Sequence, residues 1–188
     1  TAWQALVEQA QLKKGEKVFI QAGSGGVGTF AIQLAKHLGA TVATTTSTSN
    51  VAWVKSLGAD VVIDYKKEDF EHLLKGYDVV LNSQDEPTLK KSLRVLKSGG
   101  KLLSISGPPD PAFGQSTQAP WFLKFAFKLI SARVRQQAKQ LKVNYSFLFM
   151  RANGEQLKQI THLIEAGVIR PVVDKVFAFE DTNEAMAY

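Results

Sequence analysis

Between residues 17 and 38 the chain carries an apolar run, a glycine-rich turn and an amphipathic helical pattern in direct succession. The run Lys17–Ala22 leads into Gly23-Ser24-Gly25-Gly26-Val27-Gly28, which has the spacing G-x-G-x-x-G. Apolar residues then recur at i, i+3 and i+4 from Val27 to Leu38, and Gly39 supplies a stop signal. A turn in this setting predicts a strand–turn–helix unit, not a free glycine loop.

The same alternation of apolar runs and helical patterns continues to residue 106. Strand-like runs occupy 17–22, 41–46, 61–63, 77–81 and 101–106. Helical patterns lie between them at 27–38, 50–57 and 87–96. Short connections between alternating strands and helices imply right-handed crossovers and a parallel sheet. The prediction is a Rossmann-type α/β fold, a doubly wound parallel sheet in three α/β/α layers.

The pattern changes after residue 107. A loop rich in proline spans 107–111, and a helix that carries basic residues is expected from about Pro120. Beyond it we expect a strand at 143–150, a helix at 156–166 and a further extended run at 172–179. Asp181, with Glu184 three residues later, has the pattern of a helix N-cap.

Composition narrows the class of protein. The 188 residues are 45% hydrophobic, they include no cysteine, and their formal net charge is +6. The expectation is a cytoplasmic protein without a disulfide, a thiolate metal site, a signal peptide or a membrane span. The apolar and basic segment 121–135 is compatible with a membrane-surface anchor or a nucleic-acid patch. We favour packing of its apolar residues near another domain, with no nucleic acid or membrane partner.

The glycines of the turn have distinct roles in a dinucleotide-binding unit. Gly23 permits the tight turn, Gly25 lets the backbone approach a pyrophosphate, and Gly28 allows close packing of the helix on the strand. The N–H groups of Gly26 and Val27 and the helix dipole would then face the phosphates. The alternative is a glycine-rich turn that binds nothing.

The end of the second strand bears on the choice of dinucleotide. Folds that bind NAD place Asp or Glu there to accept bonds from the ribose hydroxyls. Here the stretch 44–50 reads Thr-Thr-Thr-Ser-Thr-Ser-Asn and has no acid, so NADP(H) is preferred. No Arg or Lys lies in this stretch, and Lys55 and Lys66 are the nearest cations. The same hydroxyl groups also suit an ordinary turn.

The chain resembles the medium-chain dehydrogenase/reductase superfamily, in its zinc-independent quinone oxidoreductase and 2-alkenal reductase branch. The resemblance covers nearly the whole chain. The segments that carry it are 1–6, 14–18, 22–36, 55–70, 92–113, 145–150 and 163–180.

This resemblance implies a role for several residues. The pyrophosphate would lie at the glycine turn and the adenosine phosphate near the second strand, with the nicotinamide beyond the fifth and last strands. Ser83 replaces the family's usual residues after the fourth strand and retains a hydroxyl that can donate. For Phe147 and Phe149 a core role is an equal alternative. The expected coenzyme-binding residues are Gly23, Ser24, Gly25, Gly26, Val27, Thr46, Ser47, Asn50, Tyr65, Ser83, Ser106, Gly107, Phe147 and Phe149.

The resemblance also implies a larger protein. Residues 1–188 would form one NADP-binding domain, without the N-terminal catalytic domain and the final C-terminal strand of the family. The whole enzyme would transfer hydride from NADPH to a quinone or an α,β-unsaturated carbonyl compound, as a homodimer joined through the edge strand 145–150. No catalytic residue or metal ligand is assigned within the chain.

Three alternatives stay open at this point. The chain could be a non-catalytic domain that senses NADPH, or part of a zinc-dependent alcohol dehydrogenase of the same superfamily. A related fold that binds S-adenosylmethionine is the third, and the glycine turn that opens a helix argues against it.

Overall fold

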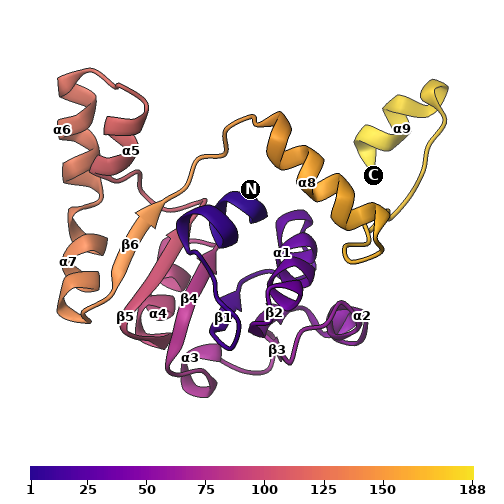
Figure 1. The fold of residues 1–188 in the computed structure, drawn as a ribbon, viewed down its shortest axis with the longest axis horizontal. Coiled ribbons are helices and arrows are strands. Elements are labelled where there is room, and N and C mark those ends of the chain that lie inside the picture. The colour runs from indigo at the N-terminus through magenta and orange to yellow at the C-terminus, as the bar shows by residue number, and fades with distance from the viewer.

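A computed structural model describes all of residues 1–188, and its centre is a six-stranded parallel sheet (Figure 1). The strand order is β3-β2-β1-β4-β5-β6, and every neighbouring pair is parallel. The order reverses between β1 and β4, which is where doubly wound sheets bind their ligands. The strands are β1 (Lys17–Ile20), β2 (Thr41–Thr46), β3 (Val61–Asp64), β4 (Tyr77–Asn82), β5 (Leu96–Ser104) and β6 (Asn144–Phe147).

Helices connect the strands and cover both faces of the sheet (Figure 1). A short π-helical segment, Gln4–Gln9, precedes β1, and 3-10 turns occur at Thr48–Asn50 and Phe179–Asp181. The α-helices are α1 (Gly26–His37), α2 (Val51–Ser56), α3 (Phe70–Leu73), α4 (Glu86–Val95), α5 (Pro111–Ser116), α6 (Trp121–Ile130), α7 (Ala132–Gln140), α8 (Gly154–Glu165) and α9 (Thr182–Ala187).

Two hydrophobic clusters, one on each face, hold the layers together. Along β1, Val18 and Ile20 belong to a cluster that includes side chains of α1, whereas Phe19 belongs to a cluster with α4 and α7. This is the alternation expected when both faces of a strand are buried. The predicted three-layer Rossmann-type fold is confirmed.

Several element boundaries differ from the prediction. β1 ends at Ile20 because Ala22 already has a left-handed backbone, with φ 52°, and begins the turn. β6 is only Asn144–Phe147, so residues 148–150 leave the sheet. The run 172–179 forms no strand, since its exposed backbone has no neighbouring strand to pair with. Asp181 precedes α9 but its side chain makes no capping bond.

The last part of the chain packs lightly on the sheet. Within residues 151–188 only Ile169 is buried. Gln33 on α1 binds the backbone of Arg170 twice, since its side-chain amide donates to the Arg170 carbonyl and its carbonyl accepts from the Arg170 N–H. After Arg170 the hydrogen bonds and ion pairs lie within residues 171–188 themselves. None of the helices has both the length and the apolar character needed to cross a bilayer.

Candidate functional site

The glycine turn is fastened to the carboxyl end of β2. The N–H of Ala22 donates to the Thr45 hydroxyl at 3.2 Å, and the N–H of Gly23 donates to the Thr45 carbonyl at 2.9 Å. The left-handed backbone at Ala22 turns the chain from β1 into α1 within five residues. Such a conformation costs free energy for a residue other than glycine, and its surroundings must hold it in place.

Close packing explains two of the three motif glycines. A β-carbon on Gly23 would lie 2.3 Å from the Thr44 hydroxyl oxygen, and one on Gly28 would lie 2.2 Å from the Ala22 carbonyl oxygen. Gly25 is less crowded, with the Ala22 carbonyl oxygen 3.3 Å from such a carbon. Gly26 has no atom within 4 Å of that position, so its surroundings are open. The turn therefore presents bare backbone at Gly25 and Gly26.

Backbone donors at this turn have no partner inside the protein. The N–H groups of Ser24, Gly26, Val27 and Gly28 donate to no backbone or side-chain acceptor. The last three belong to the first turn of α1, which has no acidic residue. Unpaired donors at the positive end of a helix dipole form an anion site. The turn therefore has the geometry that a pyrophosphate group requires.

The hydroxyl-rich segment after β2 forms its own hydrogen-bond chain. Asn50 donates to the Ser47 hydroxyl at 3.2 Å, and the indole N–H of Trp53 donates to the Asn50 carbonyl oxygen at 3.0 Å. Ser47 and Asn50 are partly exposed at this end of the sheet. Thr46 is buried and its hydroxyl has no partner in the protein, so it does not line the surface as its expected role requires.

One carboxylate lies next to this segment, at the end of β3. Asp64 is buried, and its side chain accepts from the Thr48 hydroxyl at 2.6 Å and from the Lys66 N–H at 3.1 Å. The hydrogen bond from Thr48, with smaller help from Lys66 and Lys67, holds the pKa of Asp64 below its usual value. This carboxylate is therefore ionised and already engaged within the protein.

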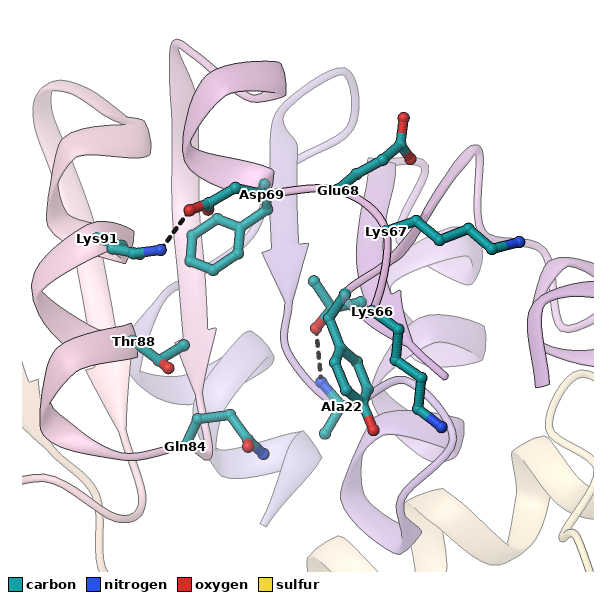
Figure 2. A pocket seen from close by; sticks show the side chains of 11 residues that line it. Ala22, Lys66, Lys67, Glu68, Asp69, Gln84, Thr88 and Lys91 are labelled. Carbon is teal, nitrogen blue, oxygen red and sulfur yellow. Dashed lines mark hydrogen bonds and ion pairs between the residues drawn. The ribbon is translucent and has the colours of Figure 1, made fainter. Parts of the chain in front are cut away.

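A hollow of about 500 Å³ opens beside the glycine turn (Figure 2). Its lining includes Ala22, Thr45, Tyr65, Gln84, Thr88 and Lys91, and Figure 2 shows Gln84, Thr88 and Lys91 across the hollow from Ala22. Tyr65 is 58% exposed. Ser47 and Asn50 are not among the lining residues. Of the residues expected around the adenosine phosphate, the hollow therefore includes Tyr65 but not these two.

A second network joins the carboxyl ends of β4 and β5. The buried amide of Asn82 donates to the Ser104 hydroxyl at 2.9 Å, and the Gly107 N–H donates to the same oxygen at 2.8 Å. The Ser106 hydroxyl donates to the Gln84 carbonyl at 2.6 Å. Ser83 lies nearer the turn, and its hydroxyl donates to the Gln21 carbonyl at 3.5 Å. Ser106 and Gly107 are thus held in place by protein contacts.

The expected nicotinamide residues lie farther along the same end of the sheet. Phe147 and Phe149 line a hollow of about 860 Å³ between β5, β6, α5 and the N-terminal segment. Their rings lie 5.1 and 6.0 Å, centroid to centroid, from the ring of Phe113. Phe149 is 69% exposed, whereas Phe147 is partly buried. Ser106 and Gly107 line a separate hollow of about 580 Å³, together with residues of α6 and α7.

The structure thus brings the expected residues to one end of the sheet, but only five of them line these three hollows: Tyr65 in the first, Phe147 and Phe149 in the second, and Ser106 and Gly107 in the third. Sequence reasoning did not single out Phe113, Gln84 or Thr88. Phe113 lies on α5, outside the predicted alternation, and only its contact with Phe147 reveals it. Gln84 is the second residue after β4, and its place close to a strand end was the available signal. Residues 1–188 contain no cluster of three or more His, Cys, Asp or Glu side chains that could hold a metal ion.

Comparison with known proteins decides the family. A family model described as zinc-binding dehydrogenase matches residues 57–188. The chain belongs to the medium-chain dehydrogenase/reductase superfamily. Within this superfamily it belongs to the quinone and enoyl reductase branch, and it forms the coenzyme-binding domain, as the sequence predicts.

Relatives in this superfamily match almost the entire chain. It is 37% identical to the NAD(P)H oxidoreductase RTN4IP1, mitochondrial, of Danio rerio, over 98% of the chain and 50% of that protein. It is 34% identical to the NADPH-dependent alkenal/one oxidoreductase, chloroplastic, of Arabidopsis thaliana, over 100% of the chain and 41% of that protein. The chain spans about half the length of the curated relatives it matches.

A solved structure of the superfamily shows the same fold. The quinone oxidoreductase from Coxiella burnetii superposes with a TM-score of 0.79 at 32% identity, over 100% of the chain and 52% of that protein. The chain therefore shares the fold of the matching half of that protein, and the first turn of α1 carries backbone N–H groups without a partner in the protein.

Proposed function

We propose that the chain is the NADP(H)-binding domain of a reductase that transfers hydride from NADPH to an α,β-unsaturated carbonyl compound or a quinone. The observation that carries the proposal is the set of unpaired N–H groups at Ser24, Gly26, Val27 and Gly28. They converge at the switch point of the sheet, where the order changes from β1 to β4.

The residues of the turn fit a dinucleotide pyrophosphate. The open space at Gly26 and the absence of a side chain at Gly25 leave room for phosphate oxygens next to the backbone. The first turn of α1 carries no acidic side chain that would repel them. In this assignment Gly25, Gly26 and Val27 hold the pyrophosphate through backbone donors.

The second strand supports a phosphorylated adenosine ribose. A carboxylate that accepts from both ribose hydroxyls is typical of NAD sites. The segment Ser47–Asn50 has no carboxylate, and the neighbouring Asp64 is already bonded to Thr48. Ser47 and Asn50 are partly exposed and carry donors, so they are suited to an anionic substituent.

The chemistry depends on the coenzyme, which supplies the hydride, while the protein orients it and excludes water. In this assignment Ser106 and Gly107 support the nicotinamide ribose, and Phe147 and Phe149 form the apolar side of the cleft. The names of the relatives, an alkenal/one oxidoreductase and a quinone oxidoreductase, support the two substrate classes. We assign the rest of the substrate pocket to a part of the protein outside these residues.

A titration with a matched pair of variants tests the coenzyme site. Gly26 and Gly154 are each the first residue of a helix, and each has no atom within 4 Å of the position that a β-carbon would occupy. Gly26→Asp should therefore fold normally but place a negative charge at the anion site. We expect it to weaken NADPH binding more than about tenfold, since a repelled phosphate also loses its backbone donors.

Gly154→Asp makes the same change at the start of α8 and should bind NADPH as the unaltered chain does. Binding is followed by the fluorescence of NADPH, and folding by circular dichroism. Equal loss in both variants, or no loss in Gly26→Asp, would contradict the assignment of the glycine turn.

A further inference from the structure

The stretch 44–50 has no lysine or arginine, although a phosphate on the adenosine ribose would be bound there. Hydroxyl and amide groups alone give weaker phosphate contacts than a charged donor does. A cation from another element would supply the missing charge.

The end of β3 brings such a cation close. The N–H of Tyr65 donates to the Thr46 carbonyl at 3.2 Å, which fastens the segment after β3 to the end of β2. The glycine turn is fastened to the same end through the 2.9 Å bond from Gly23 to Thr45. Only β2 therefore separates the end of β3, where Lys66 lies, from the glycine turn after β1. Lys66 also lines the hollow beside the turn.

The direction of the side chains separates Lys66 from its charged neighbours. Figure 2 shows Lys66 extending toward the end of the hollow where Ala22 lies. Lys67 and Glu68 point away from that end. Among Lys66, Lys67 and Glu68, Lys66 is thus the charged side chain that extends toward the end of the hollow where Ala22 lies.

The ion pairs of the region also distinguish Lys66 from the neighbouring lysines. Lys91 pairs with Asp69, and Lys67 lies 3.5 Å from the Asp64 carboxylate. The ammonium group of Lys66 makes no ion pair and donates to no acceptor in the protein. Two carboxylates close to Lys66 in the sequence already have partners, because Asp64 accepts from the Thr48 hydroxyl and Asp69 pairs with Lys91.

We infer that Lys66 determines the preference for NADP(H) over NAD(H) by pairing with the phosphate on the adenosine ribose. This inference rests on the proposed coenzyme-binding function and names the residue that sets its specificity. Lys66 acts from the end of β3, and the Ser47 hydroxyl and the Asn50 side-chain amide complete the phosphate site from the end of β2.

The test compares Lys66→Gln, Lys66→Arg and Lys67→Gln with the unaltered chain. Dissociation constants for NADPH and NADH are measured by fluorescence titration at low and at moderate salt. Lys66→Gln should weaken NADPH binding about tenfold and change NADH binding less than about twofold. Lys66→Arg should keep the preference for NADPH, and Lys67→Gln should leave both constants unchanged.

A second probe isolates the phosphate. Adenosine 2′-monophosphate, added as a competitor of NADPH, should lose affinity in Lys66→Gln, whereas adenosine 5′-monophosphate should not. The contrast should shrink as salt rises, because the contact lies at an exposed site.

The failures of the two proposals are distinguishable. If the folded, unaltered chain binds neither coenzyme, the proposed function is wrong and the role of Lys66 is wrong with it. If NADPH binds and Lys66→Gln leaves its affinity intact, or weakens NADPH and NADH equally, only the role of Lys66 is wrong.

Discussion

The hydroxyl group of Thr44 occupies the space that a β-carbon on Gly23 would need, with only 2.3 Å between the two atoms. Thr44 is fully buried, and its hydroxyl donates to the Ile20 carbonyl at 2.6 Å. It therefore cannot move aside without losing that bond. The first motif glycine is required by packing against β2 as well as by the turn.

A double-mutant cycle measures this contact. Gly23→Ala should lower the free energy of unfolding by roughly 2 kcal/mol, because it overpacks a buried site. Thr44→Ala should cost about 1–2 kcal/mol through the lost hydrogen bond and the cavity. In the double variant the cost of Gly23→Ala should fall by about 1 kcal/mol, since its obstacle is gone. Urea unfolding gives all three values, and strict additivity would disprove the contact.

Two glycines of the same turn should respond in opposite ways to alanine. Gly28→Ala places a carbon 2.2 Å from the Ala22 carbonyl oxygen and should destabilise the chain by roughly 2–3 kcal/mol. Gly26→Ala meets no atom within 4 Å and should leave stability unchanged or raise it by up to about 1 kcal/mol. Thermal unfolding of both variants is the measurement, and a similar loss in each would contradict the packing at the turn.

Asp78 should contribute to acid sensitivity. Burial acts to raise its pKa, but the 2.8 Å bond from the Lys17 N–H and the ion pair with Lys97 outweigh burial and leave the pKa lowered. Because the pKa is lower in the folded state, the stabilisation is complete above the pKa of the unfolded chain, about 3.9. It is lost as the pH falls through the folded value.

Asp78→Asn should therefore lower stability at pH 7 by about 1 kcal/mol and flatten the decline of stability below about pH 4. The free energy of unfolding is measured by urea titration across the acid range up to neutral pH. Asp181→Asn serves as the control, since Asp181 makes no ion pair. An unchanged acid slope in Asp78→Asn would show that other carboxylates carry the effect.

Asp110 covers the outer edge of the sheet. Its buried carboxylate accepts from the Phe113 N–H at 2.9 Å, as the cap of α5, and from the Phe147 N–H at 3.3 Å on β6. β6 pairs with β5 alone, so Phe147 lies at the edge where the sequence predicts a homodimer. The carboxylate therefore occupies a donor that a pairing strand would use.

Asp110→Ala should expose that donor and increase self-association, measured by sedimentation velocity at several concentrations. Loss of the helix cap should also cost about 1 kcal/mol of stability. Asp85→Ala is the matched control. Asp85 caps α4 by accepting from the Thr88 N–H, so this variant also loses a helix cap, but Asp85 makes no hydrogen bond to β6. Equal association of both variants would point to destabilisation in general.

Local sequence was sufficient to predict the centre of the fold. The glycine turn and the period of apolar residues predicted β1, α1 and the parallel alternation, since both signals lie within single elements. The edge position of β6 was predicted as well. The left-handed Ala22 was not, because it depends on the bonds that Thr45 makes across the sheet.

The candidate site was predictable to a smaller extent. The position of the glycine turn at the end of the sheet follows from the motif. The burial of Thr46 and the hydrogen bond from the Thr48 hydroxyl to the Asp64 carboxylate both depend on the pairing of β2 with β3. Residue types alone do not reveal that pairing. The separation of Ser106 from Phe147 into different hollows depends on α5, α6 and α7, which lie outside the predicted alternation.

The light attachment of the chain after Arg170 has a consequence for unfolding. Residues 171–188 contribute no buried side chain, and their hydrogen bonds do not reach the sheet. Such a segment opens independently of the core, at a small fraction of the global free energy. Its amide hydrogens should exchange with solvent long before those of β1 and β4, and limited proteolysis should shorten the chain from this end while the Rossmann core stays intact.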